Sequence, residues 1–150
     1  MNKAQEYAKA ENLERWAFQW SQARLVFVAI TLFLGGTPLV YKILPYGLSS
    51  LTFSLLNLAW IISGVASAYL LYTWHTGGHK VFGDRDHKDT AAFLISTISG
   101  LNLGYAGIIG TNLGMKISSG ALIFILVGLL YLASVWHLQR RWKDSKEKVF

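Results

Sequence analysis

Long runs of apolar residues alternate with short polar segments along the whole chain. The runs cover about residues 24–41, 48–74, 91–113 and 117–137, and none has a charged residue or a histidine in its interior. A helix of about 20 residues crosses the ~30 Å hydrocarbon core of a bilayer, and the first run reaches that length if its helix begins near Trp16. The pattern predicts an all-α integral membrane protein, built as a bundle of four transmembrane helices.

The segment before the first run has a different pattern. Residues 4–22 contain no glycine or proline, and their apolar side chains recur at helical spacing, at Leu13, Trp16, Ala17 and Trp20. A helix of this kind lies in the membrane interface or continues into the first span, with its tryptophans at the level of the headgroups. We predict an N-terminal amphipathic helix that anchors the chain, in preference to one that recognises a partner.

The far end of the first run is interrupted by a Gly-Gly-Thr-Pro sequence at residues 35–38. Pro38 has no backbone N–H to donate, and its ring crowds the preceding helical turn. We therefore expect the first helix to kink or end there.

Charged residues are distributed unevenly between the polar segments. Of the 14 Lys and Arg residues, only Lys42 and Lys116 fall in the connections after the first and third runs, and all eight acidic residues lie in the other segments. Cytoplasmic segments of membrane proteins carry an excess of Lys and Arg. Both termini, the loop at 75–90 and the basic tail at 138–150 are therefore predicted to be cytoplasmic.

Length and composition limit the classes of protein further. Four spans leave no length for a separate soluble domain, so residues 1–150 are predicted to form a single membrane domain. The net charge of +6 is explained by basic ends beside the spans, which attract anionic headgroups, and we expect no nucleic acid partner. The chain has no cysteine, which excludes disulfides, thiolate metal sites and iron–sulfur clusters.

Small residues form stripes at helical spacing in the second and third runs. Such stripes let two helix backbones approach closely in a membrane. The predicted helix-packing residues are Gly100, Gly104, Gly107, Thr111 and Gly114 in the third run, and Ser54 and Gly64 in the second.

A second set of residues places polar side chains at membrane depth. These predicted intramembrane polar residues are Asn102, Tyr105 and Asn112, opposite the glycine stripe, and Asn57 and Trp60 in the second run. Since neither face of the third helix suits lipid, we expect that helix to have protein neighbours on two sides, one of them in another subunit. This expectation favours a homo-oligomer or a larger complex.

The loop between the second and third runs holds several residues that bind metals. His75, His79 and His87, with Asp84 and Asp86, supply imidazole and carboxylate ligands for a zinc, manganese or iron site. Their spacing matches no strong metal motif. The alternative interpretation, which we prefer, is a hydrated loop whose glycines end the second helix.

Two further expectations concern residues at the helix ends. Asp89 and Thr90 are predicted to cap the third helix. His75 and His137 are possible axial ligands of a b-type haem, but transmembrane haem ligands lie inside apolar spans rather than at their ends. We therefore predict no cofactor, with a metal ion or haem as the alternatives, and we expect bound lipid.

No catalytic nucleophile beside a base and no nucleotide-binding fingerprint is found. The predicted function is that of a non-enzymatic small membrane subunit of a homo-oligomer or larger complex, with lipids and copies of itself or other membrane subunits as partners. The first alternative is an oligomeric channel or transporter for a small solute, lined by residues such as Asn57 and Asn102. The second is a metal- or haem-dependent enzyme or redox subunit at the cytoplasmic face.

Overall fold

A computed structural model describes residues 10–38, 40–44 and 49–150. This part of the chain is helical, with one isolated bridge between Val81 and Asp84 and no β-strand, which confirms the all-α prediction. In chain order the helices are α2 (Ala10–Phe33), α3 (Val40–Ile43), α4 (Ser49–Thr76), α5 (His87–Ile109), α6 (Leu113–Ile117) and α7 (Ala121–Asp144). The predicted start of the interfacial segment, residues 4–9, lies outside the described residues.

Three of the long helices can cross a membrane. In the described residues, α4, α5 and α7 are each long and apolar enough to do so, as predicted from the second, third and fourth runs. Within the most apolar stretch of each helix, 50% of the residues are buried in α5, but only 17% in α4 and 22% in α7. Helix α5 is therefore the central helix, and α4 and α7 expose apolar surface suited to lipid.

Helix α2 has the second of the two arrangements predicted for the N-terminal segment. It continues from the predicted interfacial helix into the first apolar run without a break at residue 23. It ends at Phe33, before Gly35 and Gly36, which both adopt positive φ, so the predicted interruption is an end of the helix. Helix α3 begins only after Pro38.

The predicted third span, residues 91–113, ended four residues too late. Helix α5 ends at Ile109, because Gly110 adopts a left-handed conformation with φ of 75° and its N–H donates to the carbonyl of Ala106. Thr111 and Gly114 therefore lie beyond α5 and do not extend its glycine stripe, which corrects the prediction. The chain forms the short helix α6 before α7 begins.

The predicted N-cap of this helix was also wrong. Asp86, not Asp89 or Thr90, caps α5, since its carboxylate Oδ1 accepts from the backbone N–H groups of Lys88 at 2.7 Å and Asp89 at 3.0 Å. These two N–H groups hold the pKa of Asp86 below its ordinary value. Asp89 lies one turn further on, and it is buried.

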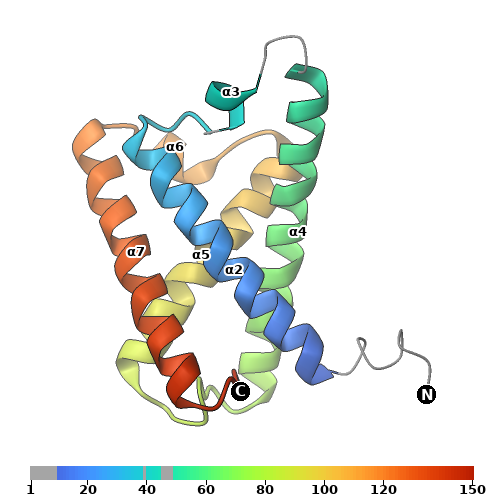
Figure 1. Cartoon of the computed structure of the whole chain (residues 1–150), viewed down its shortest axis with the longest axis vertical. Coiled ribbons are helices and arrows are strands. Elements are labelled where there is room, and N and C mark those ends of the chain that lie inside the picture. The colour runs from blue at the N-terminus through green and yellow to red at the C-terminus, as the bar shows by residue number, and fades with distance from the viewer. Residues whose placement is uncertain (1–9, 39, 45–48) are drawn as a thin grey trace.

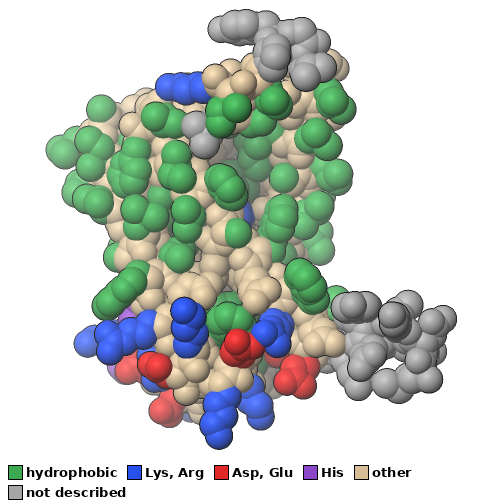
Figure 2. All heavy atoms as spheres, in the orientation of Figure 1, with side chains coloured by type: hydrophobic (Ala, Val, Ile, Leu, Met, Phe, Trp, Pro, Cys, Tyr) green, Lys and Arg blue, Asp and Glu red, His purple; other side chains and the backbone are tan. Residues whose placement is uncertain are grey.

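The described helices form one bundle with two different ends (Figure 1). Helices α3 and α6 lie together at one end, which we call the α6 end. The start of α2, the connection at 77–86 and the C-terminus lie at the other end. Figure 2 shows Lys, Arg, Asp and Glu side chains gathered at that second end, below a wide hydrophobic surface, so we call it the charged end.

The charged end contains the main hydrophobic core. Its buried members are Phe18, Leu70, Val81, Phe82, Ala92, Phe93, Leu138, Trp142 and Val149. The ring of Phe18 from α2 lies 5.8 Å from that of Phe82 and 5.7 Å from that of Trp142. The backbone N–H of Phe82 donates to the carbonyl of Val149, and Arg15 forms an ion pair with Glu147. The C-terminal segment thus closes this end of the bundle.

The glycine stripe packs α5 against α4 within the chain. A Cβ atom added to Gly104 would lie 2.5 Å from the Cα of Gly64, and one added to Gly107 would lie 2.9 Å from a side-chain carbon of Ile61. Only glycines allow the two backbones to approach this closely. Ser54, at the far end of the predicted α4 stripe, is exposed, and its hydroxyl donates to the carbonyl of Ser50.

Candidate functional site

A partly open cavity of about 640 Å³ lies between α2, α4, α5 and α7, and residues of α6 line it at the α6 end. Its volume falls within the range of ligand pockets, roughly 300–1,000 Å³. Most of its wall is apolar, with Phe27, Leu56, Leu103, Ile123, Phe124 and Val127 among the lining side chains. Figure 2 shows a shaded recess between hydrophobic side chains on the viewed face.

Among the residues that the structure describes, one cation lies in the wall of this cavity. The side chain of Arg24, on α2, is only 7% exposed. Its Nη1 donates to the hydroxyl of Ser99 at 3.2 Å, and its Nη2 donates to the carbonyl of Ser96 at 2.7 Å, both on α5. Its Nε has no hydrogen-bond partner among the described residues, and none of their carboxylates forms an ion pair with it.

The glycine stripe provides the space for this side chain. A Cβ atom added to Gly100 would lie 3.0 Å from the guanidinium carbon of Arg24 and would collide with the hydroxyl of Ser67. Gly100 therefore leaves room for the side chain of Arg24 as well as for the close contact between α4 and α5.

Of the two predicted polar residues on α4, Trp60 lines the cavity and Asn57 lies in the contact with α5. Trp20 from α2 also lines the cavity, and its Nε1 donates to the hydroxyl of Ser63 on α4 at 3.0 Å. Asn57 is half-buried, and its backbone carbonyl lies against Gly107 in the contact between α4 and α5.

The predicted asparagines hold α6 in place beside the cavity. The Nδ2 of Asn102 donates to the Oδ1 of Asn112 at 2.9 Å, and the Oδ1 of Asn102 accepts from the backbone N–H of Leu113 at 3.0 Å. Asn112 caps α6 by accepting from the N–H of Met115. These bonds satisfy amide groups inside the chain, so they do not require a second subunit. Tyr105, on the same predicted face, is 41% exposed.

The structure does not gather the predicted metal ligands. Nδ1 of His75 and Nε2 of His79 lie 3.1 Å apart at the end of α4, whereas His87 begins α5 and Asp86 caps it. Within residues 10–38, 40–44 and 49–150, no three His, Asp or Glu side chains are close enough together to hold a metal ion. Asp84 pairs through its backbone with Val81. The predicted ligands thus have separate local roles.

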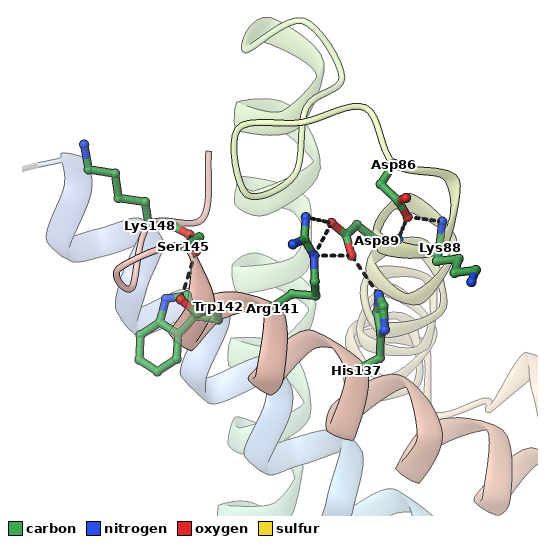
Figure 3. A network of polar contacts seen from close by, with 8 residues as sticks. All are labelled: Asp86, Lys88, Asp89, His137, Arg141, Trp142, Ser145 and Lys148. Carbon is green, nitrogen blue, oxygen red and sulfur yellow. Dashed lines mark hydrogen bonds and ion pairs between the residues drawn. The ribbon is translucent and has the colours of Figure 1, made fainter.

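A second buried ionic group joins α5 to α7 at the charged end (Figure 3). The carboxylate of Asp89 is fully buried. It accepts from Nε2 of His137 at 2.7 Å and from Nε of Arg141 at 2.9 Å, with Nη2 of Arg141 at 2.8 Å. His137 is therefore occupied by this carboxylate rather than directed at His75, its partner in the haem alternative.

Sequence reasoning missed the role of Arg24. We placed it at the cytoplasmic boundary, because it was counted with the basic residues that precede the first span. Treated as one helix, the segment places Ser21, Arg24 and Val28 at i, i+3 and i+7, on one face. That periodicity was the available signal that Arg24 is directed into the bundle.

Comparison of the chain with models of protein families, with curated proteins and with solved structures finds no match. The function is therefore argued from the cavity and its lining residues.

Proposed function

We propose that this chain is a non-enzymatic integral membrane protein that binds a small hydrophobic or amphipathic molecule inside its helix bundle. The observation that carries the proposal is the cavity of about 640 Å³, whose wall is mainly apolar and holds a few convergent polar groups. This combination is typical of small-molecule sites. Because the outer surfaces of α4 and α7 suit lipid, the surrounding bilayer is the natural source of such a molecule.

The proposed topology has four spans, with α2 as the fourth. From Trp16 to its end at Phe33 it has 18 residues, which extend about 27 Å at 1.5 Å per residue, close to the ~30 Å thickness of the hydrocarbon core. The start of α2, the C-terminus and the 77–86 connection all lie at the charged end (Figure 1). The positive-inside rule therefore supports a cytoplasmic location for that end, with α3 and α6 on the opposite side.

Cysteine labelling tests this topology, because the chain has no native cysteine. Lys116→Cys on α6 and Lys143→Cys on α7 are both exposed positions. A membrane-impermeant maleimide is expected to label Lys116→Cys in intact cells and Lys143→Cys only after the membrane is permeabilised. Labelling of both, or of Lys143→Cys alone, in intact cells would contradict the topology.

Native mass spectrometry tests the ligand. Protein extracted from its membrane and purified in a mild detergent is expected to carry a non-covalent small-molecule adduct. Val127→Trp fills part of the cavity, since Val127 lines it, and is expected to lose the adduct. Leu126→Trp is the matched control, because Leu126 is 56% exposed and outside the cavity wall, and it should keep the adduct. A wild-type protein without an adduct would overturn the proposal.

Assembly into an oligomer or a larger complex stays a prediction from the sequence. The glycine stripe and the two asparagines, on which that expectation depended, have partners within the chain. Tyr105, predicted on the same face of the third helix as the two asparagines, is exposed. The intact mass in the same spectrum reports how many copies or partners each particle contains.

A further inference from the structure

We propose that the cavity selects an amphiphile with a single negative charge, whose anionic oxygen head binds the guanidinium of Arg24 while its apolar chain fills the rest of the cavity. This inference rests on the proposed function, and it adds the chemical class of the ligand. The shared chemistry is a monoanionic head on an apolar body, as in a fatty acid or an anionic phospholipid.

The first step of the argument is the missing counter-ion. Arg24 is always charged, because a guanidinium does not lose its proton in proteins. A buried cation is unfavourable unless a partner compensates it, and ionisable residues at membrane depth usually mark a ligand or ion path. In the described residues Arg24 has serine and carbonyl oxygens as partners but no carboxylate. An anion from outside the chain would neutralise it.

The second step is the geometry of the donors. The bonds to Ser96 and Ser99 fix the guanidinium against α5, so its position does not depend on a ligand. Its Nε remains without a partner among the described residues, although the side chain is buried and lines the cavity. Charge-assisted bonds from arginine to an anionic oxygen are short, strong and directional. The guanidinium carries five N–H groups, more than its three bonds to Ser96 and Ser99 use. A charged group with donors to spare therefore matches an oxyanion better than a neutral apolar end.

The third step concerns the charge and shape of the ligand. Among the described residues no other Lys or Arg lines the cavity, so a single negative charge balances the site and two would exceed it. From Arg24 to the end of α2 at Phe33 the helix rises about 14 Å, at 1.5 Å per residue. The cavity wall continues over this length to Pro38 and Met115, with mostly apolar side chains. An apolar chain thus fits between Arg24 and the α6 end.

Tryptophan quenching measures this selectivity, because Trp20 and Trp60 line the cavity. The probes are 9,10-dibromostearate and its neutral analogue 9,10-dibromostearyl alcohol, added to the whole protein in a nonionic detergent. We expect the carboxylate to bind at least tenfold more tightly than the alcohol. Trp60→Phe should reduce the quenched fraction for both probes, which locates them in the cavity.

Variants of Arg24 assign the selectivity to its charge. Arg24→Gln is expected to weaken binding of the carboxylate at least tenfold and to leave binding of the alcohol unchanged, whereas Arg24→Lys keeps a preference for the carboxylate. If Arg24→Gln does not fold, the affinities of the wild-type protein and of Arg24→Lys for the carboxylate and the alcohol still test the inference. Brominated phosphatidylglycerol, which is also monoanionic but has two chains, distinguishes a phospholipid ligand from a fatty acid. Quenching by this probe that depends on Arg24 supports the proposal and identifies a phospholipid as the ligand.

Two outcomes would overturn the inference, and they differ in what else they affect. Equal affinities for dibromostearate and the alcohol in the wild-type protein would contradict the requirement for an anionic head. The cavity would then be a site for neutral ligands. Absence of quenching by all three probes would contradict the proposed function as well.

Discussion

Gly104→Ala is expected to lower the free energy of unfolding by about 3 kcal/mol, the upper part of the usual range for overpacking. The added methyl group would lie 2.5 Å from the Cα of Gly64. A backbone atom cannot rotate away as a side chain can, so α4 and α5 would have to separate along their contact. Lipid tails are as apolar as the helix surfaces, and close packing is a main source of helix association in a membrane. Equilibrium unfolding in mixed micelles measures the loss.

Two other glycines provide the controls. Gly64→Ala places its methyl group 2.6 Å from the Cα of Gly104, so it should cost as much as Gly104→Ala. Gly120→Ala adds its methyl group in open space, at a residue whose φ of −70° is allowed for alanine, and should change stability by less than about 0.5 kcal/mol. Equal stabilities of Gly104→Ala and Gly120→Ala would show that α4 and α5 are not in close contact at this point.

The sequence predicted the elements that hydrocarbon thickness determines. Helices α4, α5 and α7 each overlap most of an apolar run, because a span must satisfy its backbone hydrogen bonds internally over the whole bilayer. The helix ends were predicted less well. The end of α5 depends on the left-handed conformation of Gly110, and a glycine in an apolar run does not reveal whether it continues a helix or ends it.

The sequence pattern could not identify which helices contact the predicted stripes. A glycine stripe indicates that some backbone approaches closely, but it does not identify which one. In the structure Gly104 meets Gly64 of the same chain, so the stripe does not need a second subunit. Asn102 and Asn112 likewise bond to each other across the chain reversal at Gly110, which the expected continuous helix excluded.

The cavity could not be predicted for a related reason. It depends on Arg24 of α2 meeting Ser96 and Ser99 of α5, residues separated by more than 70 positions along the chain. Hydropathy places each residue at a depth in the membrane, but it does not give the rotation of one helix relative to another. The buried carboxylate of Asp89, whose partners lie on α7, was missed for the same reason.

Arg141→Met is expected to lower the free energy of unfolding by about 2–3 kcal/mol. The carboxylate of Asp89 is fully buried, and without Arg141 its described partner is His137 alone. Removing one partner of a buried ion pair costs roughly 3–5 kcal/mol, and we reduce this value because the side chain of Arg141 is 36% exposed. Methionine keeps much of the apolar length of the arginine, so lost packing contributes little. Equilibrium unfolding in micelles again gives the measurement.

The neighbouring arginine gives the comparison, and a double variant identifies the cause. Arg140 is exposed and lies 5.8 Å from the ring of Trp136, so Arg140→Met should cost no more than about 1 kcal/mol, the value of an exposed cation–π contact. If the loss in Arg141→Met comes from an uncompensated carboxylate, Asp89→Asn combined with Arg141→Met should be more stable than Arg141→Met alone, because no buried charge is left without its partner. A double variant that loses the sum of both single effects would instead show that the ion pair acts only through packing between α5 and α7.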